Sequence, residues 1–295
     1  MVRTVQEVLK DAVDRLEKTG AWTPLLDAEV LLCEVLGIDR LYLYIQRGRS
    51  LSREERDSFE ALLEKRIQGV PLQYITYRQE FMGLDFYVEE GVLIPRADTE
   101  ILVEVVLQWV AEEPAFKAYN STLNIVDLGT GSGAITVSLA KYIEKVHVYS
   151  VDLSEKALSI GRKNAEQNGV LDKITFLQGD LMQPLMEKGL FGQIDILVSN
   201  PPYIPAKDID GLQVEVAKFE PRMALDGGAD GLDFYRRIVA RGDQLLRHGG
   251  RIALEVGHDQ ADSVKNMMAN KKNYANIKKY QDLAGIERVV AATVI

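Results

Sequence analysis

The sequence predicts an α/β protein with a seven-stranded sheet, preceded by a small helical bundle and a β-hairpin. Short β-branched segments alternate with segments of helical period over residues 123–295, which is the pattern of a parallel sheet covered by helices on both faces. Residues 1–70 carry helical patterns alone, whereas residues 71–92 are rich in Tyr, Phe, Ile and Thr, which favour strands. We therefore expect a helical domain over 1–70, a hairpin linker over 71–92 and a larger domain over 93–295.

The helical domain is predicted from its start and stop signals. Residues 4–7 and 52–55 form capping boxes, and each precedes apolar residues at helical spacing. Thr23 before Pro24 opens a further helix, and residues 40–46 are a shorter candidate. Nothing in this domain is typical of catalysis, so we expect either a module that docks a partner or a bundle that only stabilises the chain.

The linker and the start of the larger domain come next. Residues 72–88, with Gly83 in the middle, predict a β-hairpin. Asp98 is expected to be the N-cap of the helix that carries Trp109. Residues 96–100 are candidates for lining a cleft and Glu220 for a covering loop; a helix cap and a surface turn are the alternatives.

The larger domain is predicted to contain seven strands and four helices after residue 120. The expected strands are residues 123–128, 146–151, 174–178, 194–199, 251–256, 277–281 and 287–295, and the expected helices are residues 134–143, 155–167, 234–247 and 260–269.

Composition and charge exclude several classes of protein. No apolar stretch is long enough to span a bilayer, and the chain opens on an amphipathic pattern rather than a signal peptide, so we expect a cytoplasmic protein. The net charge of −9 disfavours non-specific binding to nucleic acid, which needs a basic surface. Cys33 lies in an apolar segment and is expected to be a small buried hydrophobe, and the scattered His147, His248 and His258 do not suggest a zinc site.

A glycine-rich loop follows the first expected strand. It reads Asp127-Leu128-Gly129-Thr130-Gly131-Ser132-Gly133. Its glycines allow a tight turn and a close approach of a ligand, while the following helix start offers N–H donors. We therefore expect this loop to bind a nucleoside-bearing cofactor. The spacing fits both NAD and S-adenosylmethionine, and a purely structural turn is the alternative.

Two acids follow the next two strands. Asp152 ends the second strand, where a carboxylate can accept hydrogen bonds from both ribose hydroxyls. Asp180 comes shortly after the third strand and is a candidate for the adenine amino group, with Leu181 flanking the ring. A turn or a helix cap is an equally good interpretation of Asp180.

The fourth strand is followed by Asn200-Pro201-Pro202-Tyr203. Two prolines stiffen the corner and donate no hydrogen bond, so we expect rigid carbonyl acceptors there. The Asn200 side-chain oxygen and the Pro201 carbonyl would accept the two hydrogens of a planar NH₂ group, while Pro202 and Tyr203 would hold its plane. The alternative is a proline-rich turn with a capping Asn.

These motifs together resemble methyltransferases that act on planar amino nitrogens. The whole chain resembles the PrmC/HemK family, also through IPRADTE at residues 94–100, ALDGG at 224–228 and EVG at 255–257. Tyr77 and Ala97 depart from the usual family pattern, in which Gly and Pro stand there. The resemblance implies a Rossmann-like class I methyltransferase domain, S-adenosylmethionine as cofactor, no metal, and N5-methylation of the glutamine in the Gly-Gly-Gln tip of class 1 peptide chain release factors.

Other functions remain open at this point. An amino methyltransferase for adenine or cytosine in nucleic acid needs the same kind of site, although the acidic charge counts against it. A methyltransferase for a ribosomal-protein glutamine would differ only in its docking domain. A catalytically silent binding module on the same fold is a further alternative. Such a module would need neither the glycine loop nor the Asn200 corner, so the presence of both counts against it.

Overall fold

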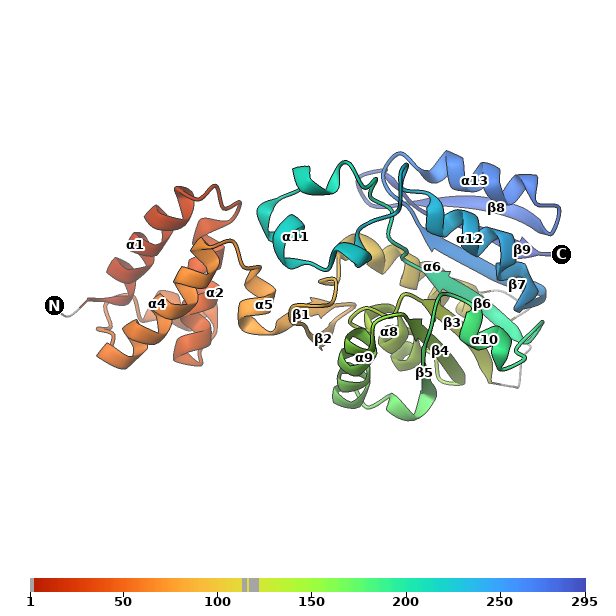
Figure 1. Cartoon of the computed structure of the whole chain (residues 1–295). Helices are drawn as coiled ribbons and strands as arrows, with labels where there is room; N and C mark the ends of the chain where they lie inside the picture. Colours follow the sequence, from red (N-terminus) through yellow and green to blue (C-terminus); the bar gives the residue numbers. More distant parts are fainter. Residues whose placement is uncertain (1–2, 113–115, 117–121) are drawn as a thin grey trace. The chain divides into compact units, whose positions relative to one another are not determined.

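The computed structural model of the protein describes residues 3–112, 116 and 122–295, and these residues fall into two compact units. One unit comprises Met1–Arg78 together with Gln213–Phe219, and the other comprises Gln79–Leu212 together with Glu220–Ile295. A short segment from the second half of the chain therefore belongs to the N-terminal unit (Figure 1).

The first unit is a helical bundle. Its helices are α1 (Val5–Glu17), α2 (Pro24–Leu36), α3 (Arg40–Ile45), α4 (Arg53–Ile67), α5 (Leu72–Thr76) and α11 (Val214–Phe219). Both predicted capping boxes are confirmed, with Thr4 and Ser52 as the N-caps. Thr23 does not cap α2 through its side chain, because its hydroxyl donates to Asp27 at 2.8 Å instead.

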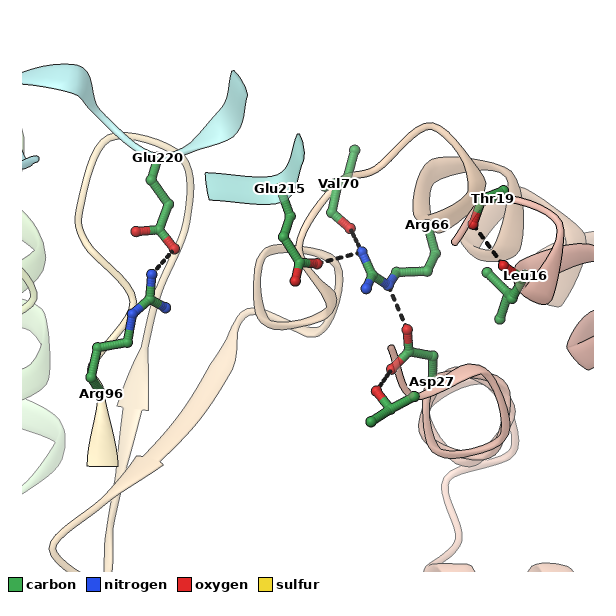
Figure 2. A network of polar contacts seen from close by, with 9 residues as sticks. Leu16, Thr19, Asp27, Arg66, Val70, Arg96, Glu215 and Glu220 are labelled. Carbon is green, nitrogen blue, oxygen red and sulfur yellow. Dashed lines mark hydrogen bonds and ion pairs between the residues drawn. The ribbon is translucent and has the colours of Figure 1, made fainter. Parts of the chain in front are cut away.

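A buried arginine ties this unit together. The Arg66 Nε atom donates to Asp27 on α2 at 2.7 Å, and its Nη1 atom donates to the Val70 carbonyl at 3.1 Å (Figure 2). The same Nη1 atom lies 2.7 Å from the carboxylate of Glu215 on α11. Arg66 thus joins α2, α4 and the inserted α11 through one nearly buried guanidinium.

The predicted hairpin is shorter than expected. Residues 72–76 form helix α5 rather than a strand, because Leu72 and Ile75 pack together against the core of the bundle at helical spacing. The hairpin itself consists of β1 (Arg78–Phe81) and β2 (Leu84–Tyr87). Tyr77 caps α5 with a left-handed backbone, φ 57°, a conformation that glycine adopts more readily.

The second unit is built on a seven-stranded sheet of order β5-β4-β3-β6-β7-β9-β8. Its strands are β3 (Leu123–Leu128), β4 (Val146–Asp152), β5 (Ile174–Gln178), β6 (Ile194–Ser199), β7 (Leu246–Glu255), β8 (Tyr274–Gln281) and β9 (Glu287–Val294). The first five are parallel, but β9 runs antiparallel to both neighbours, so the expectation of a wholly parallel sheet is wrong at this end. The connection from β8 to β9 is too short for a parallel crossover.

Helices cover the sheet as expected. They are α6 (Glu100–Glu112), α8 (Ala134–Tyr142), α9 (Glu155–Gln167), α10 (Gln183–Glu187), α12 (Asp233–Arg241) and α13 (Ala261–Asn270). One apolar core lies under α6 and α8, and another lies under α12 and α13. In the described part of the chain, we find no helix of the length and apolar character needed to cross a membrane.

Two local predictions in this unit are wrong. The helix expected over 234–247 ends at Arg241, and β7 begins at Leu246, where it pairs with Ile194 before a bulge. Asp98 does not cap α6, because a 3₁₀ helix over Ala97–Thr99 precedes that helix and Asp98 pairs with Arg288 at 2.8 Å instead.

Candidate active site

A cavity of about 540 Å³ opens at the carboxyl ends of β3, β4 and β6. β3 is the first strand of the sheet and pairs with β4 on one side and β6 on the other, so the strand order reverses here. Open α/β sheets bind ligands at this point. The predicted site residues that line the cavity are Gly129, Thr130, Gly131, Ser132, Asp152, Asp180, Leu181, Asn200, Pro201 and Pro202, whereas Gly133 and Tyr203 are not part of its lining.

The glycine loop has the backbone that its sequence predicts. Gly129 and Gly131 have φ of 89° and 54°, where a side chain would be strained. The Gly129 N–H donates to the Val151 carbonyl at 2.8 Å, and the Gly131 N–H donates to the Asp152 carboxylate at 2.9 Å. The loop therefore presents bare backbone to the cavity and is fixed to the end of β4.

A buried polar network supports this loop, and sequence reasoning missed it. Thr136 donates to the Asp127 carboxylate at 2.5 Å and lies 2.7 Å from the Ser150 hydroxyl, which in turn lies 2.8 Å from the Thr130 hydroxyl. Burial raises the pKa of Asp127 to about 7. Ser150 in the apolar strand β4 was the available signal, because a hydroxyl in a buried strand needs a partner.

Asp152 occupies the predicted position beside the cavity. Its two carboxylate oxygens accept hydrogen bonds from the backbone N–H groups of Gly131 at 2.9 Å and Ser154 at 2.8 Å. Burial raises its pKa. Since each carboxylate oxygen has a second lone pair, Asp152 can hold the loop and still accept from two ligand hydroxyls.

Asp180 also lines the cavity, but it has a protein partner. Arg237 on α12 donates to its carboxylate at 2.5 Å, and Arg237 lines the same cavity. The adjacent Leu181 has φ of 50° and packs against the core under α12. Asp180 therefore holds the Arg237 guanidinium at this wall of the cavity, and it also remains a candidate for binding the cofactor.

The Asn200 corner lies across the cavity from Asp152, at the end of β6. The Ser199 hydroxyl donates to the Leu128 carbonyl at 2.6 Å, which joins the end of β6 to the end of β3. The Asn200 Nδ2 atom donates to the Thr99 hydroxyl at 3.1 Å. Because a planar amide has its oxygen on the opposite arm, this contact leaves the Asn200 oxygen available as an acceptor.

The backbone carbonyl of Tyr203 already has a protein partner. Gln260 Nε2 donates to the Tyr203 carbonyl at 2.9 Å, and the next residue, Ile204, exchanges backbone hydrogen bonds with Leu225 and Gly227. Burial raises the pKa of Tyr203 to about 12. Its phenol therefore stays protonated and neutral at pH 7, so Tyr203 is suited to packing against a substrate and not to accepting a proton.

The other candidate residues separate into two groups. Arg96 lines the cavity and donates to the Glu220 carboxylate at 2.6 Å, so the segment after the corner is tied to the cavity wall (Figure 2). Glu100 accepts from the Met82 N–H at 2.6 Å and is not part of the lining, so it holds the hairpin instead.

A glycine loop after the first strand, an acid after the second and Asn-Pro-Pro-Tyr after the fourth, on this sheet, define a class I methyltransferase that acts on a planar nitrogen. Residues 119–289 match the model of a methyltransferase domain, and residues 7–76 match that of the PrmC N-terminal domain. The chain belongs to the release factor glutamine methyltransferase family, and it is an enzyme.

Curated relatives match over nearly the whole chain. A release factor glutamine methyltransferase from Moorella thermoacetica is 43% identical over 98% of this chain and 98% of its own length. The protein of the same name from Geobacter sulfurreducens is 40% identical over 99% of this chain and 97% of its own length. Among solved structures, the hMettl16 catalytic domain, in complex with MAT2A 3′UTR hairpin 6, has the same fold, with 16% identity, a TM-score of 0.53 and coverage of 83% of this chain and 84% of that one.

Proposed function

We propose that this chain transfers a methyl group from S-adenosylmethionine to the side-chain nitrogen of the glutamine in the Gly-Gly-Gln tip of class 1 peptide chain release factors. One observation carries this assignment to a planar amide: Asn200 lines the cavity with its NH₂ group bound to Thr99, so that its oxygen is left to accept from a substrate NH₂. The names of the full-length relatives support the choice of substrate.

The cavity suits S-adenosylmethionine. We assign the bare backbone of residues 129–133 to the region nearest the amino-acid part, Asp152 to the ribose hydroxyls, and Asp180 with Leu181 to the adenine. A side chain at Gly129 or Gly131 would be strained, since both residues have positive φ. When bound, the cofactor supplies an electrophilic methyl carbon.

The corner solves an orientation problem. An amide nitrogen is a poor nucleophile because its lone pair is delocalised into the carbonyl. In our proposal Asn200 Oδ1 and the Pro201 carbonyl accept the two amide hydrogens, and Pro202 and Tyr203 hold the amide plane. Positive charge that develops on the nitrogen is stabilised by these fixed dipoles more than the neutral amide is. Good alignment is worth up to about 7–11 kcal/mol in favourable cases, so no strong base is required.

The helical unit is the proposed docking module for the release factor. Its helix α3 exposes four large side chains of apolar or aromatic character, with Leu41 68%, Tyr42 54%, Tyr44 43% and Ile45 70% accessible. Exposed apolar side chains that are adjacent on a small helix favour contact with another protein. The match of residues 7–76 to the PrmC N-terminal domain agrees with this role.

Transfer of a labelled methyl group tests the proposal. The protein is incubated with labelled S-adenosylmethionine and purified release factor, with ribosomes and DNA as competing acceptors. We expect label on the release factor alone, and none on a release factor whose tip glutamine is alanine. Label on ribosomes or DNA instead would assign the site to a ribosomal glutamine or to a nucleobase.

The variant Asn200→Ala tests the role of the corner, with Asn270→Ala as control on the exposed end of α13. Asn200→Ala should reduce kcat by about 10²–10³-fold, as is typical when a fixed dipole at the reacting centre is lost. Cofactor affinity should change little. Transfer at the unsubstituted rate with saturating cofactor would reject the assignment.

A further inference from the structure

A buried acid lies beside the Asn200 corner, and nothing in the proposed function yet uses it. Ser199 at the end of β6 pairs in register with Leu254 of β7, so Asn200 and Glu255 leave the sheet side by side. The side chain of Glu255 is buried, with 2% of the residue exposed, and its carboxyl lies beside the Thr99 hydroxyl, which acts to lower the pKa of the carboxyl. That hydroxyl also accepts from Asn200 Nδ2 at 3.1 Å. Glu255, Thr99 and Asn200, from three segments distant in sequence, therefore lie next to one another.

We propose that Glu255, acting through the Thr99 hydroxyl, fixes which end of the Asn200 amide faces the substrate. This inference rests on the proposed methyl transfer to a glutamine amide. Glu255 and Thr99 are positioning residues in this scheme, since neither needs to touch the reacting atoms.

The direction of the hydrogen bonds between Glu255, Thr99 and Asn200 follows from the number of protons on each group. An ionised carboxylate can only accept, so Thr99 must give its single hydroxyl proton to Glu255. The Thr99 oxygen is then left to accept, and the group that Asn200 turns toward it must be its NH₂. Asn200 Oδ1 consequently faces the substrate, where it accepts from the amide hydrogen. If these hydrogen bonds reversed, two NH₂ groups would face each other and the substrate nitrogen would lose its acceptor.

The second carboxyl oxygen makes this polarity testable. Within the described residues, Glu255 Oε2 is fully buried and has no hydrogen-bond partner. A glutamine at this position would leave two unsatisfied N–H donors there if its NH₂ took the place of Oε2, which is costly. It would therefore turn its NH₂ toward Thr99. The Thr99 hydroxyl would then accept from residue 255 and donate to Asn200 Oδ1, which reverses the hydrogen bonds.

The charge state of Glu255 is set by its surroundings. Burial raises its pKa to about 7; Asp98 acts in the same direction, while the Thr99 hydrogen bond, Arg288 and Arg96 act against it. The phenols of Tyr203 and Tyr235 also face the carboxyl, and burial raises the pKa of each, with Glu255 adding to the effect. Below about pH 7 the protonated carboxyl can donate to Thr99, so the fixed polarity is lost.

Three variants test the inference in the full chain with release factor as substrate. Thr99→Val removes the relay at nearly constant volume, Glu255→Gln is expected to reverse it, and Thr99→Ser keeps the hydroxyl. We expect Thr99→Val and Glu255→Gln to lower kcat roughly ten- to a hundredfold, the usual loss when a supporting hydrogen bond to a functional group is removed. Thr99→Ser should stay within about threefold of the unsubstituted protein.

Cofactor affinity and the pH profile separate positioning from general damage. Calorimetry should give S-adenosylmethionine affinities within about threefold of the unsubstituted protein for all three variants. The unsubstituted protein should lose kcat below about pH 7, and this limb should be absent in Glu255→Gln. Asp127 has a raised pKa in the same range but supports the cofactor loop, so Asp127→Asn is compared by the shape of its pH profile and not by its rate, and the limb should remain.

The outcomes are distinct. The inference is overturned if Glu255→Gln and Thr99→Val keep kcat within threefold, or if cofactor affinity falls in parallel with kcat. Glu255→Gln removes a buried charge, so it decides the question even if Thr99→Val does not fold. Absence of transfer by the unsubstituted protein would reject the proposed function itself, whereas an active protein with fully active variants would reject the positioning role alone.

Discussion

Replacing Gly227 by alanine should slow methyl transfer while leaving the cofactor site intact. Gly227 lies next to the Asn200 corner, because its N–H donates to the carbonyl of Ile204, the residue after the corner, at 2.9 Å. A Cβ atom at Gly227 would lie 2.8 Å from the Pro202 carbonyl oxygen, the Tyr203 Cα and the Gly231 Cα. All three are backbone atoms, so no side chain can rotate away to make room.

The size of the effect follows from these distances. Carbon atoms pack best at about 3.5–4.0 Å, so the contacts are short by roughly 0.7 Å and the backbone at Pro202 and Tyr203 must move by an amount of that order. A misplacement of about 1 Å at a reacting centre can cost about a hundredfold in rate. We therefore expect kcat to fall by roughly ten- to a hundredfold. Overpacking should also lower the free energy of unfolding by about 1–3 kcal/mol.

The assay is labelled methyl transfer to release factor, with cofactor affinity measured by calorimetry. Gly211→Ala is the matched control, because a Cβ there has no atom within 4 Å and Gly211 does not have a positive φ. The control should keep both kcat and affinity. An unchanged kcat in Gly227→Ala would show that the corner tolerates displacement, and the geometric account of Asn200 and Pro201 would be wrong.

Three further predictions concern charged side chains. Arg66→Met should lower the free energy of unfolding of the helical unit, measured by urea denaturation, by about 3–5 kcal/mol, because the buried Asp27 carboxylate loses its partner. Arg53→Met, at an exposed site, should leave it unchanged, and equal values for the two variants would refute this prediction. Asp127→Asn should gain stability relative to the unsubstituted protein as pH rises from about 4 to 7, because the folded-state pKa of about 7 makes ionisation of Asp127 destabilising. A difference in unfolding free energy that does not change with pH would contradict this prediction. Asp152→Asn should raise the dissociation constant of S-adenosylmethionine, measured by calorimetry, at least about tenfold, because hydrogen bonds to a charged group are worth about 1.5–3 kcal/mol. An unchanged dissociation constant would show that Asp152 does not bind the cofactor.

The parts of the fold that follow from local patterns were predictable. The glycine loop and the Asn200 corner each follow a short buried strand, and parallel strands bring their carboxyl ends to one edge. Capping boxes gave the starts of α1 and α4 because the two reciprocal hydrogen bonds involve residues only three positions apart. Strand order and the short β8–β9 connection also explain why the last two strands are antiparallel, although the alternating pattern alone did not show it.

Predictions failed where a distant partner decides the local structure. Residues 72–76 have the composition of a strand, but contacts of Leu72 and Ile75 with the helical core make them a helix. Asp98 has the position of an N-cap, but Arg288 from β9 pairs with its carboxylate. Tertiary contacts outweigh intrinsic preference at both positions, and neither partner lies within reach of a sequence window.

The Thr99 relay shows the same limit at the site itself. Thr99 looked like part of a helix start and Glu255 like the end of a strand, and each pattern alone favours an unremarkable role. Only the register of β6 against β7 places Glu255 beside Asn200. One rule would have drawn attention to it: an acid between apolar residues at the carboxyl end of a strand is buried, and a buried carboxyl needs a hydrogen-bond donor. A search for that donor leads to the Thr99 hydroxyl, and the single proton of a hydroxyl then dictates which way Asn200 must point.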